Sequence, residues 1–196
     1  MHPEILSLFL FMLGTSCSPG PNNIVASYSS FNFGIIKTFP HMLGVIFGFT
    51  TMVCVLNFGL INIFKLYPLL QEILKIFGSV FLIYLAYKIS FSKKSKENKK
   101  ENPVKFLETY LFQFLNPKGV IVGIIIVSTY VENGNNFLNY SFWVILVSFI
   151  CALISITFWT FVGKFFRRFA TNEKFINVFN YVMSSLLLAC IATFYL

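Results

Sequence analysis

Long apolar segments separated by short polar connections dominate this chain. Six of them are long enough to form membrane-spanning helices, because crossing a hydrocarbon core of roughly 30 Å takes about 20 apolar residues. We expect these helices at about residues 5–31, 39–63, 69–90, 106–131, 140–162 and 175–195. The pattern predicts an all-α integral membrane protein with six transmembrane helices, forming a single transmembrane domain over residues 1–196.

Composition excludes an ordinary soluble domain. Hydrophobic residues make up 57% of the chain and charged residues 11%, whereas soluble globular chains have roughly 45–50% and about 25%. The core of a 196-residue chain cannot bury so much apolar surface, so lipid must serve as a second solvent. All four cysteines (Cys17, Cys54, Cys151 and Cys190) fall inside apolar segments, which argues against a disulfide framework.

The basic residues cluster in alternate loops. The net charge is +8, and the even-numbered loops contribute only Lys65 and Lys75. The odd-numbered loops and their flanks hold Lys37, Lys88, Lys93, Lys94, Lys96, Lys99, Lys100, Lys105, Lys164, Arg167, Arg168 and Lys174. The positive-inside rule therefore predicts that the odd loops face the cytoplasm and that both termini lie outside.

One polar linker divides the chain into halves. Residues 92–105 form a basic loop between a first half, 1–91, and a second half, 106–196. We interpret it as a solvated loop that fixes topology, with contact to anionic lipid or a partner as the alternative. The N-terminal segment lacks a basic region before it and a convincing cleavage site, so we expect a retained first helix rather than a signal peptide.

Proline interrupts the first helix of each half. The first break is Ser18-Pro19-Gly20-Pro21 and the second is Asn116-Pro117-Lys118-Gly119. Proline removes a helical hydrogen bond, and in lipid the freed backbone groups need other partners. With three helices per half, the halves enter the membrane in opposite directions. Together these features favour two inverted three-helix repeats whose broken first and fourth helices form a binding site near the midplane.

The breaks carry chemistry suited to a zwitterion. A half-helix starting after Pro21 would offer free N–H groups to a carboxylate, and freed carbonyls could receive an ammonium group. A charge at Lys118 is costly near mid-membrane unless it is paired or hydrated. The alternative is that the prolines only shape the bundle and that Lys118 lies in a water-filled vestibule. The expected substrate-binding residues are Pro19, Gly20, Pro21, Asn22, Asn23, Asn116, Pro117 and Lys118.

Several motifs occur in the order found in one transporter family. They are the segment 18–23 with Gly34 after it, the glycines Gly44, Gly48 and Gly59, the stretch from Gly78 through Tyr84-Leu85, and Asn116-Pro117-Lys118. In these motifs the chain resembles the LysE/RhtB family of amino-acid exporters, the LysE type translocators. The likeness covers the first two-thirds of the chain, and the last two helices match only in hydropathy.

The resemblance implies a six-helix secondary transporter that exports amino acids or close derivatives across the cytoplasmic (inner) membrane, driven by the proton motive force. Two positions depart from the family pattern. Phe49 stands where many members have an acidic residue, and Thr109 stands where many have glycine.

Three other classes of function are open to a chain of this kind: a purely structural or assembly protein, a thiol relay and an enzyme. A transmembrane thiol-disulfide relay would use Cys17 beside Pro19, but the partner cysteine expected near Pro117 does not occur in the sequence. An enzyme usually needs a cluster of catalytic side chains, and two scattered histidines without any Asp provide none. We therefore expect no enzymatic activity, no cofactor, no metal and no nucleic acid. The expected partners are a small-molecule substrate and the lipid bilayer, with a homo-oligomer as a further possibility.

Overall fold

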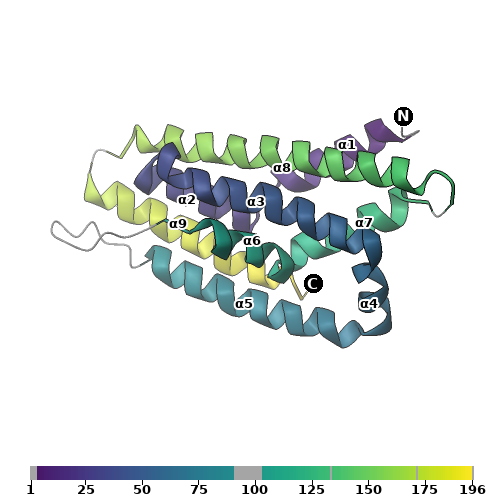
Figure 1. Cartoon of the computed structure of the whole chain (residues 1–196). Coiled ribbons are helices and arrows are strands. Elements are labelled where there is room, and N and C mark those ends of the chain that lie inside the picture. Colours follow the sequence, from purple (N-terminus) through teal and green to yellow (C-terminus); the bar gives the residue numbers. More distant parts are fainter. Residues whose placement is uncertain (1–3, 91–102, 133, 171, 196) are drawn as a thin grey trace.

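The computed structural model describes residues 4–90, 103–132, 134–170 and 172–195, which are helical and contain no strand (Figure 1). Most of the basic loop predicted at 92–105 lies outside these ranges. The elements are α1 (Ile5–Cys17), α2 (Pro21–Phe33), α3 (Ile35–Val55), the π-helical turn η1 (Leu56–Leu60), α4 (Ile61–Leu66), α5 (Pro68–Ser90), α6 (Phe106–Leu115), α7 (Pro117–Tyr130), α8 (Phe137–Arg167) and α9 (Glu173–Ala192). The prediction of an all-α membrane protein is confirmed.

Four stretches of helix are long and apolar enough to cross a bilayer by themselves. They are Ile35–Ile63, Glu72–Ser90, Phe137–Arg167 and Glu173–Ala192. Helices α6 and α7 together qualify as a fifth span that is bent by 62° at the second proline break. Helix α1 is apolar but only 13 residues long, so a sixth span made of α1 and α2 stays a prediction.

Corresponding helices of the two halves run in opposite directions (Figure 1). The α2–α3 turn, the C-terminal ends of α5 and α8 and the N-terminal end of α9 lie at one end of the molecule. The N-terminus, the α4–α5 turn and the α7–α8 connection lie at the other. This arrangement agrees with the predicted inverted repeat. It also brings Lys37 near the start of α3, Lys88 near the end of α5 and Arg167 at the end of α8 to the same end.

Each half packs its second span against the broken helix of the other half. The most extensive contacts join α2 to α8, α3 to α6, and α3 to α8. Gly44 and Gly48 allow the α3–α6 contact, because a Cβ at either position would lie only 2.7 Å from α6 atoms. These two glycines therefore permit the close packing of α3 against α6.

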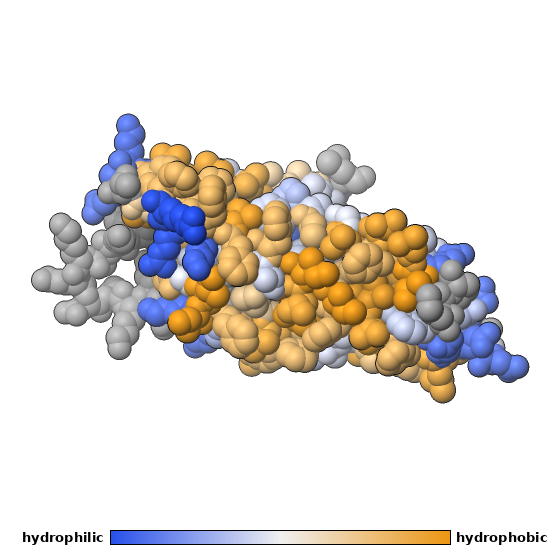
Figure 2. All heavy atoms as spheres, turned by 90° about the horizontal axis from the view of Figure 1, so that it is seen from above, coloured by the Kyte–Doolittle hydropathy of each residue, from blue (hydrophilic) through white to orange (hydrophobic). Residues whose placement is uncertain are grey.

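Helix α2 is polar in sequence yet buried in the structure, from Ile24 through Phe31. The outer surface is instead apolar, and Figure 2 shows a hydrophobic middle with hydrophilic residues gathered at the two ends. Large exposed side chains of this surface include Phe47, Phe77, Phe142 and Phe158. An apolar exterior around a polar central helix is the arrangement that lipid favours, since polar groups must find partners inside the bundle.

Candidate functional site

The two proline breaks meet inside the bundle, and Lys118 joins them. Its ammonium donates to the hydroxyl of Ser18 at 2.6 Å and lies 3.4 Å from the carbonyl oxygen of the same residue. Gly20 leaves room for this approach, because a Cβ there would be 3.0 Å from the Lys118 nitrogen. The Lys118 charge is thus hydrogen-bonded to the opposite half, which reduces the free-energy cost of placing it inside the membrane-spanning bundle.

Side chains close the first break by binding its freed carbonyl groups. Asn23 donates to the carbonyl of Ser16 at 2.7 Å, and from α8 the Ser155 hydroxyl donates to the same carbonyl at 2.6 Å. The Trp159 indole, also from α8, donates to the carbonyl of Cys17 at 3.0 Å. The sequence analysis expected a substrate ammonium to bind these freed carbonyls. In this conformation they already accept hydrogen bonds from side chains of the protein. Asn23 therefore holds the break together.

A network of polar side chains connects the first half to α6. Asn22 donates to Gln113 at 2.8 Å and Gln113 donates back at 3.1 Å, so the two amides form a reciprocal pair. His41, which is 2% exposed on α3, lies between the Asn22 carbonyl at 3.1 Å and the Thr109 hydroxyl at 2.9 Å. Thr109, where the resemblance leads us to expect glycine, thus supplies a hydrogen-bonding partner for His41.

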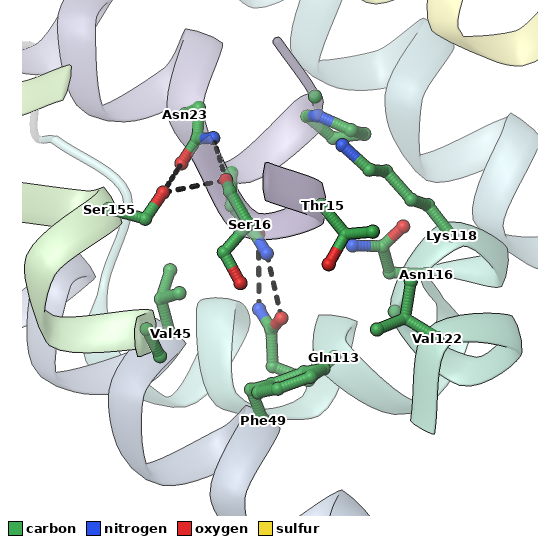
Figure 3. Close-up of a pocket in the computed structure, with 15 residues that line it drawn as sticks. Thr15, Ser16, Asn23, Val45, Phe49, Gln113, Asn116, Lys118, Val122 and Ser155 are labelled. Atoms are coloured by element: carbon green, nitrogen blue, oxygen red, sulfur yellow. Dashed lines mark hydrogen bonds between the residues drawn. The ribbon is translucent and has the colours of Figure 1, made fainter. Parts of the chain in front are cut away.

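Between the breaks lies a cavity with about 70 Å³ of room for the centres of water-sized molecules. Figure 3 shows Thr15, Asn116 and Lys118 side by side at this cavity, with Gln113 and Phe49 across from them. Among the described residues that line it, Lys118 alone is charged. The lining residues are Thr15, Ser16, Gly20, Pro21, Asn22, Asn23, Val45, Phe49, Gln113, Asn116, Lys118, Gly119, Val122, Ala152 and Ser155.

Asn116 leaves one buried acceptor at this cavity. The residue is 3% exposed, and its Oδ1 has no hydrogen-bond partner within the described chain. It also precedes Pro117, the first residue of α7, just as Gly20 precedes Pro21 at the start of α2. Neither helix start has a side-chain cap, so both half-helices present their positive ends without a competing side-chain oxygen.

The structure brings together six of the eight residues predicted from sequence. Gly20, Pro21, Asn22, Asn23, Asn116 and Lys118 line the cavity, whereas Pro19 and Pro117 lie at the breaks without lining it. Sequence reasoning missed Gln113 and Ser155. A signal was available for both, because each is a polar residue within an apolar span, and Gln113 precedes Asn116 by about one helical turn.

Broken helices that meet at a polar cavity inside an apolar bundle define a class of protein, the secondary transporters. Comparison with known proteins gives the family. The LysE type translocator model matches residues 13–195, and the chain belongs to this family. The resemblance found from the motifs is confirmed, and it extends over the last two helices.

The chain is also similar to curated relatives over almost its whole length. It is 31% identical to the Cysteine/O-acetylserine efflux proteins of Salmonella choleraesuis (strain SC-B67) and Salmonella typhimurium, over 97% of this chain and 97% of each relative. It is 28% identical to the protein of the same name from Escherichia coli (strain K12), with the same coverage. No solved structure gives a significant match. Family membership makes the chain a multi-pass membrane transporter rather than an enzyme or a thiol relay.

Proposed function

We propose that this transporter exports small neutral amino acids and their O-acyl derivatives, which bind in the cavity between the two breaks. Amino-acid export is the function of the family to which the chain belongs, and the relatives named above export cysteine and O-acetylserine. One observation carries the site assignment. The cavity lies where the two half-helices begin, and Lys118 is the single charged residue among its described lining residues.

The positive end of this cavity suits the substrate carboxylate. The Lys118 ammonium and the N-terminus of α2 both place positive charge near the first break. A carboxylate that enters would compete with Ser18 for the Lys118 ammonium. Because hydrogen bonds between ions are stronger than those to a neutral hydroxyl, the exchange favours the substrate.

The substrate ammonium needs acceptors, and Asn116 supplies one. Its Oδ1 is buried without a partner, so a donor from the substrate would remove an existing desolvation cost. The Thr15 hydroxyl donates to the carbonyl of Phe11 at 2.9 Å and retains lone pairs that can accept. No carboxylate lines the described cavity, and Phe49 fills the position where an acid is common. A substrate with a cationic side chain would therefore find no counter-ion in this cavity.

Cavity size favours small substrates. One water molecule needs about 10–15 Å³ of room for its centre. The cavity's volume of about 70 Å³ therefore corresponds to roughly five to seven water-sized positions. That is close to the number of non-hydrogen atoms in a small amino acid. Larger derivatives would require Lys118 or the Asn22–Gln113 pair to move.

Transport follows from rocking of the two halves around this site, as in other inverted-repeat carriers. The Lys118–Ser18 and Asn22–Gln113 contacts both join one half to the other, so they would break and re-form as access alternates. In this proposal the basic end faces the cytoplasm and both termini lie outside. The proton motive force supplies the energy for export against a concentration gradient.

Efflux from proteoliposomes tests the function and its energy source together. Vesicles are loaded with labelled cysteine, O-acetylserine, serine or lysine, and an imposed proton gradient is compared with the same gradient collapsed by a protonophore. We expect gradient-dependent export of the first three and little export of lysine. If no amino acid moves, the proposed function is wrong, and if the protonophore has no effect, the assigned energy source is wrong.

A matched pair of variants isolates the site. Asn116→Ala removes the unpartnered acceptor at the cavity. Asn57→Ala removes another buried asparagine whose Oδ1 lacks a partner in the described structure, but Asn57 lies in η1 and bonds Ser141 at 2.8 Å, away from the cavity. We expect the KM for export to rise at least about tenfold in Asn116→Ala and to stay near wild type in Asn57→Ala, since one hydrogen bond to a charged group contributes about 1.5–3 kcal/mol. Equal KM values in both variants would contradict the site assignment.

A further inference from the structure

A second cavity lies at the basic end of the molecule, away from the proposed transport site. It has a volume of about 550 Å³ and lies between the α2–α3 turn and the C-terminal end of α8. Ser30, Gly34 and Ile36 line it from one side, and Lys164 and Arg167 from the other. Its volume falls in the range of roughly 300–1,000 Å³ that is typical of ligand pockets.

The two basic side chains carry unneutralised positive charge. Lys164 and Arg167 lie about one turn apart on α8 and so face the same way. Within the ranges that the structure describes, the single ion pair joins Lys75 to Glu72, and neither cavity cation has an acidic partner. Lys164 instead lies 5.8 Å from the centre of the Phe161 ring. Two cations without a counter-ion at one cavity indicate an anionic ligand.

Arg167 reaches this cavity because Gly34 has no side chain in its path. A Cβ at Gly34 would lie 2.9 Å from a terminal nitrogen of the Arg167 guanidinium. Gly34 also has φ of 87°, a conformation that side chains with a Cβ rarely adopt. The turn between α2 and α3 therefore allows the guanidinium to lie against its backbone at the edge of the cavity.

Ser30 provides an independent sign of a ligand. It is 0% exposed, it lines the cavity, and its hydroxyl oxygen has no hydrogen-bond partner in the described chain. A buried hydroxyl without a partner costs free energy that a ligand oxygen would recover. The hydroxyl can donate one hydrogen bond to an anion that the two cations attract.

We propose that this cavity binds the phosphate headgroup of an anionic glycerophospholipid. Lys164 and Arg167, both exposed, contact the phosphate oxygens, and the buried Ser30 hydroxyl reaches them when its side chain turns toward the cavity. The acyl chains follow the apolar wall beside Ile36, which is 89% exposed. This wall distinguishes a lipid from a free anion, because inorganic phosphate would gain nothing from apolar contact. The position also fits a lipid. Figure 2 shows the border between the hydrophobic surface and the hydrophilic end, where α8 ends, and a headgroup lies at such a border.

Binding at this place would join the two halves. Gly34 belongs to the turn between the first two spans of the first half, whereas Lys164 and Arg167 belong to the second half. A phosphate held by both would favour the conformation in which they lie together. The inference does not depend on which substrate is exported or on where that substrate binds.

Lipid titration of the purified protein in a neutral detergent tests the proposal. Thermal unfolding and native mass spectrometry are recorded with phosphatidylglycerol, with phosphatidylcholine and with inorganic phosphate as separate probes. The charge-removing variant is Lys164→Gln/Arg167→Gln. Its matched control is Arg168→Gln/Lys174→Gln, which removes the same charge from the same end outside the cavity lining. Ser30→Ala tests the hydroxyl without any change in charge.

We expect phosphatidylglycerol to bind the wild type and to raise its unfolding temperature above the value in phosphatidylcholine. Affinity should fall roughly 20–30-fold in Lys164→Gln/Arg167→Gln, given the usual effect of basic residues at an anionic surface, and about two- to tenfold in Ser30→Ala. The control pair should lose less than about threefold. Equal losses in the two charge pairs would show a general surface attraction and overturn the site. So would equal stabilisation by inorganic phosphate, or an affinity in Ser30→Ala equal to that of wild type.

Discussion

Asn22 and Gln113 exchange two hydrogen bonds, of 2.8 and 3.1 Å, across the boundary between the two halves of the transporter. The pair connects the half-helix after the first break to the helix before the second. Gln113 also donates to the carbonyl of Thr109 at 2.8 Å, which orients its amide toward Asn22. Both residues line the cavity proposed for the substrate. A contact between halves at the cavity itself is suited to couple binding to movement.

A double-mutant cycle on this pair measures that coupling. Asn22→Ala and Gln113→Ala should each destabilise the protein by about 1–3 kcal/mol, because the first leaves the buried Gln113 amide and the second the half-buried Asn22 amide without its partner. The double variant should lose less than the sum of the two. Unfolding of the four proteins in detergent gives the interaction free energy. Strict additivity would show that the two amides do not interact.

Removing the charge at Lys118 should reduce transport without reducing the stability of the protein. In Lys118→Met, the kcat/KM for export should fall roughly 10–150-fold, the equivalent of one hydrogen bond to a charged group at about 1.5–3 kcal/mol. The free energy of unfolding should stay the same or increase, since a charge is expensive at this depth. Efflux rates and thermal unfolding measure the two effects. Lys37→Gln, an exposed basic residue on α3, serves as the control and should change neither.

The first break should loosen when its bond to α8 is lost. Trp159→Phe keeps an aromatic ring but removes the donor to the Cys17 carbonyl, so we expect a loss of about 1–3 kcal/mol of stability. Thr160→Val on the same helix is the matched control, because within the described residues the Thr160 hydroxyl bonds only to a carbonyl of its own helix, that of Ile156. Unfolding experiments should place this control within about 1 kcal/mol of wild type. Equal losses in both variants would mean that the indole bond contributes little.

Cavity size can be reduced at Gly119 without a clash. A Cβ there would meet its nearest neighbours, Asn116 and Met52, at 3.6 and 3.7 Å, which is ordinary contact. Gly119→Ala should therefore fold normally and narrow the cavity by about one methyl group. We expect the KM for O-acetylserine to rise more than the KM for serine, by a few-fold. An equal change in KM for both substrates would argue that Gly119 does not limit the size of the substrate.

Packing of α3 against α6 should not tolerate a side chain at Gly48. A Cβ would lie 2.7 Å from Gln113 and 2.8 Å from the Tyr110 carbonyl oxygen, so the backbones must separate. Gly48→Ala should lose about 1–3 kcal/mol of stability and reduce export, because it displaces Gln113. Gly14→Ala is the control, since a Cβ there meets nothing within 4 Å. It should be neutral or slightly stabilising in the helix. Thermal unfolding of both variants tests the contrast.

The sequence by itself determined the membrane class, the positions of the apolar helices and the two breaks. These features depend on local composition, because an apolar run of sufficient length and a proline inside it have the same consequence in any fold. Boundaries were less exact. The fifth helix, expected at 140–162, extends over Phe137–Arg167, since Lys and Arg can stay helical beyond the apolar core. The second span, expected at 39–63, starts earlier and covers Ile35–Ile63, with Gly59 at φ of 145° within η1 just before α4.

Only the tertiary structure decided which polar residues meet. Lys118 and Ser18 are far apart along the chain, and so are Asn22 and Gln113. Their pairing depends on how closely α3 and α6 approach and on how the halves are inverted. The sequence identified Asn23 as a substrate ligand candidate, but the structure places its amide on the Ser16 carbonyl, where it closes the break. A span buries whichever residues its neighbours cover, and hydropathy along a single helix does not contain that information.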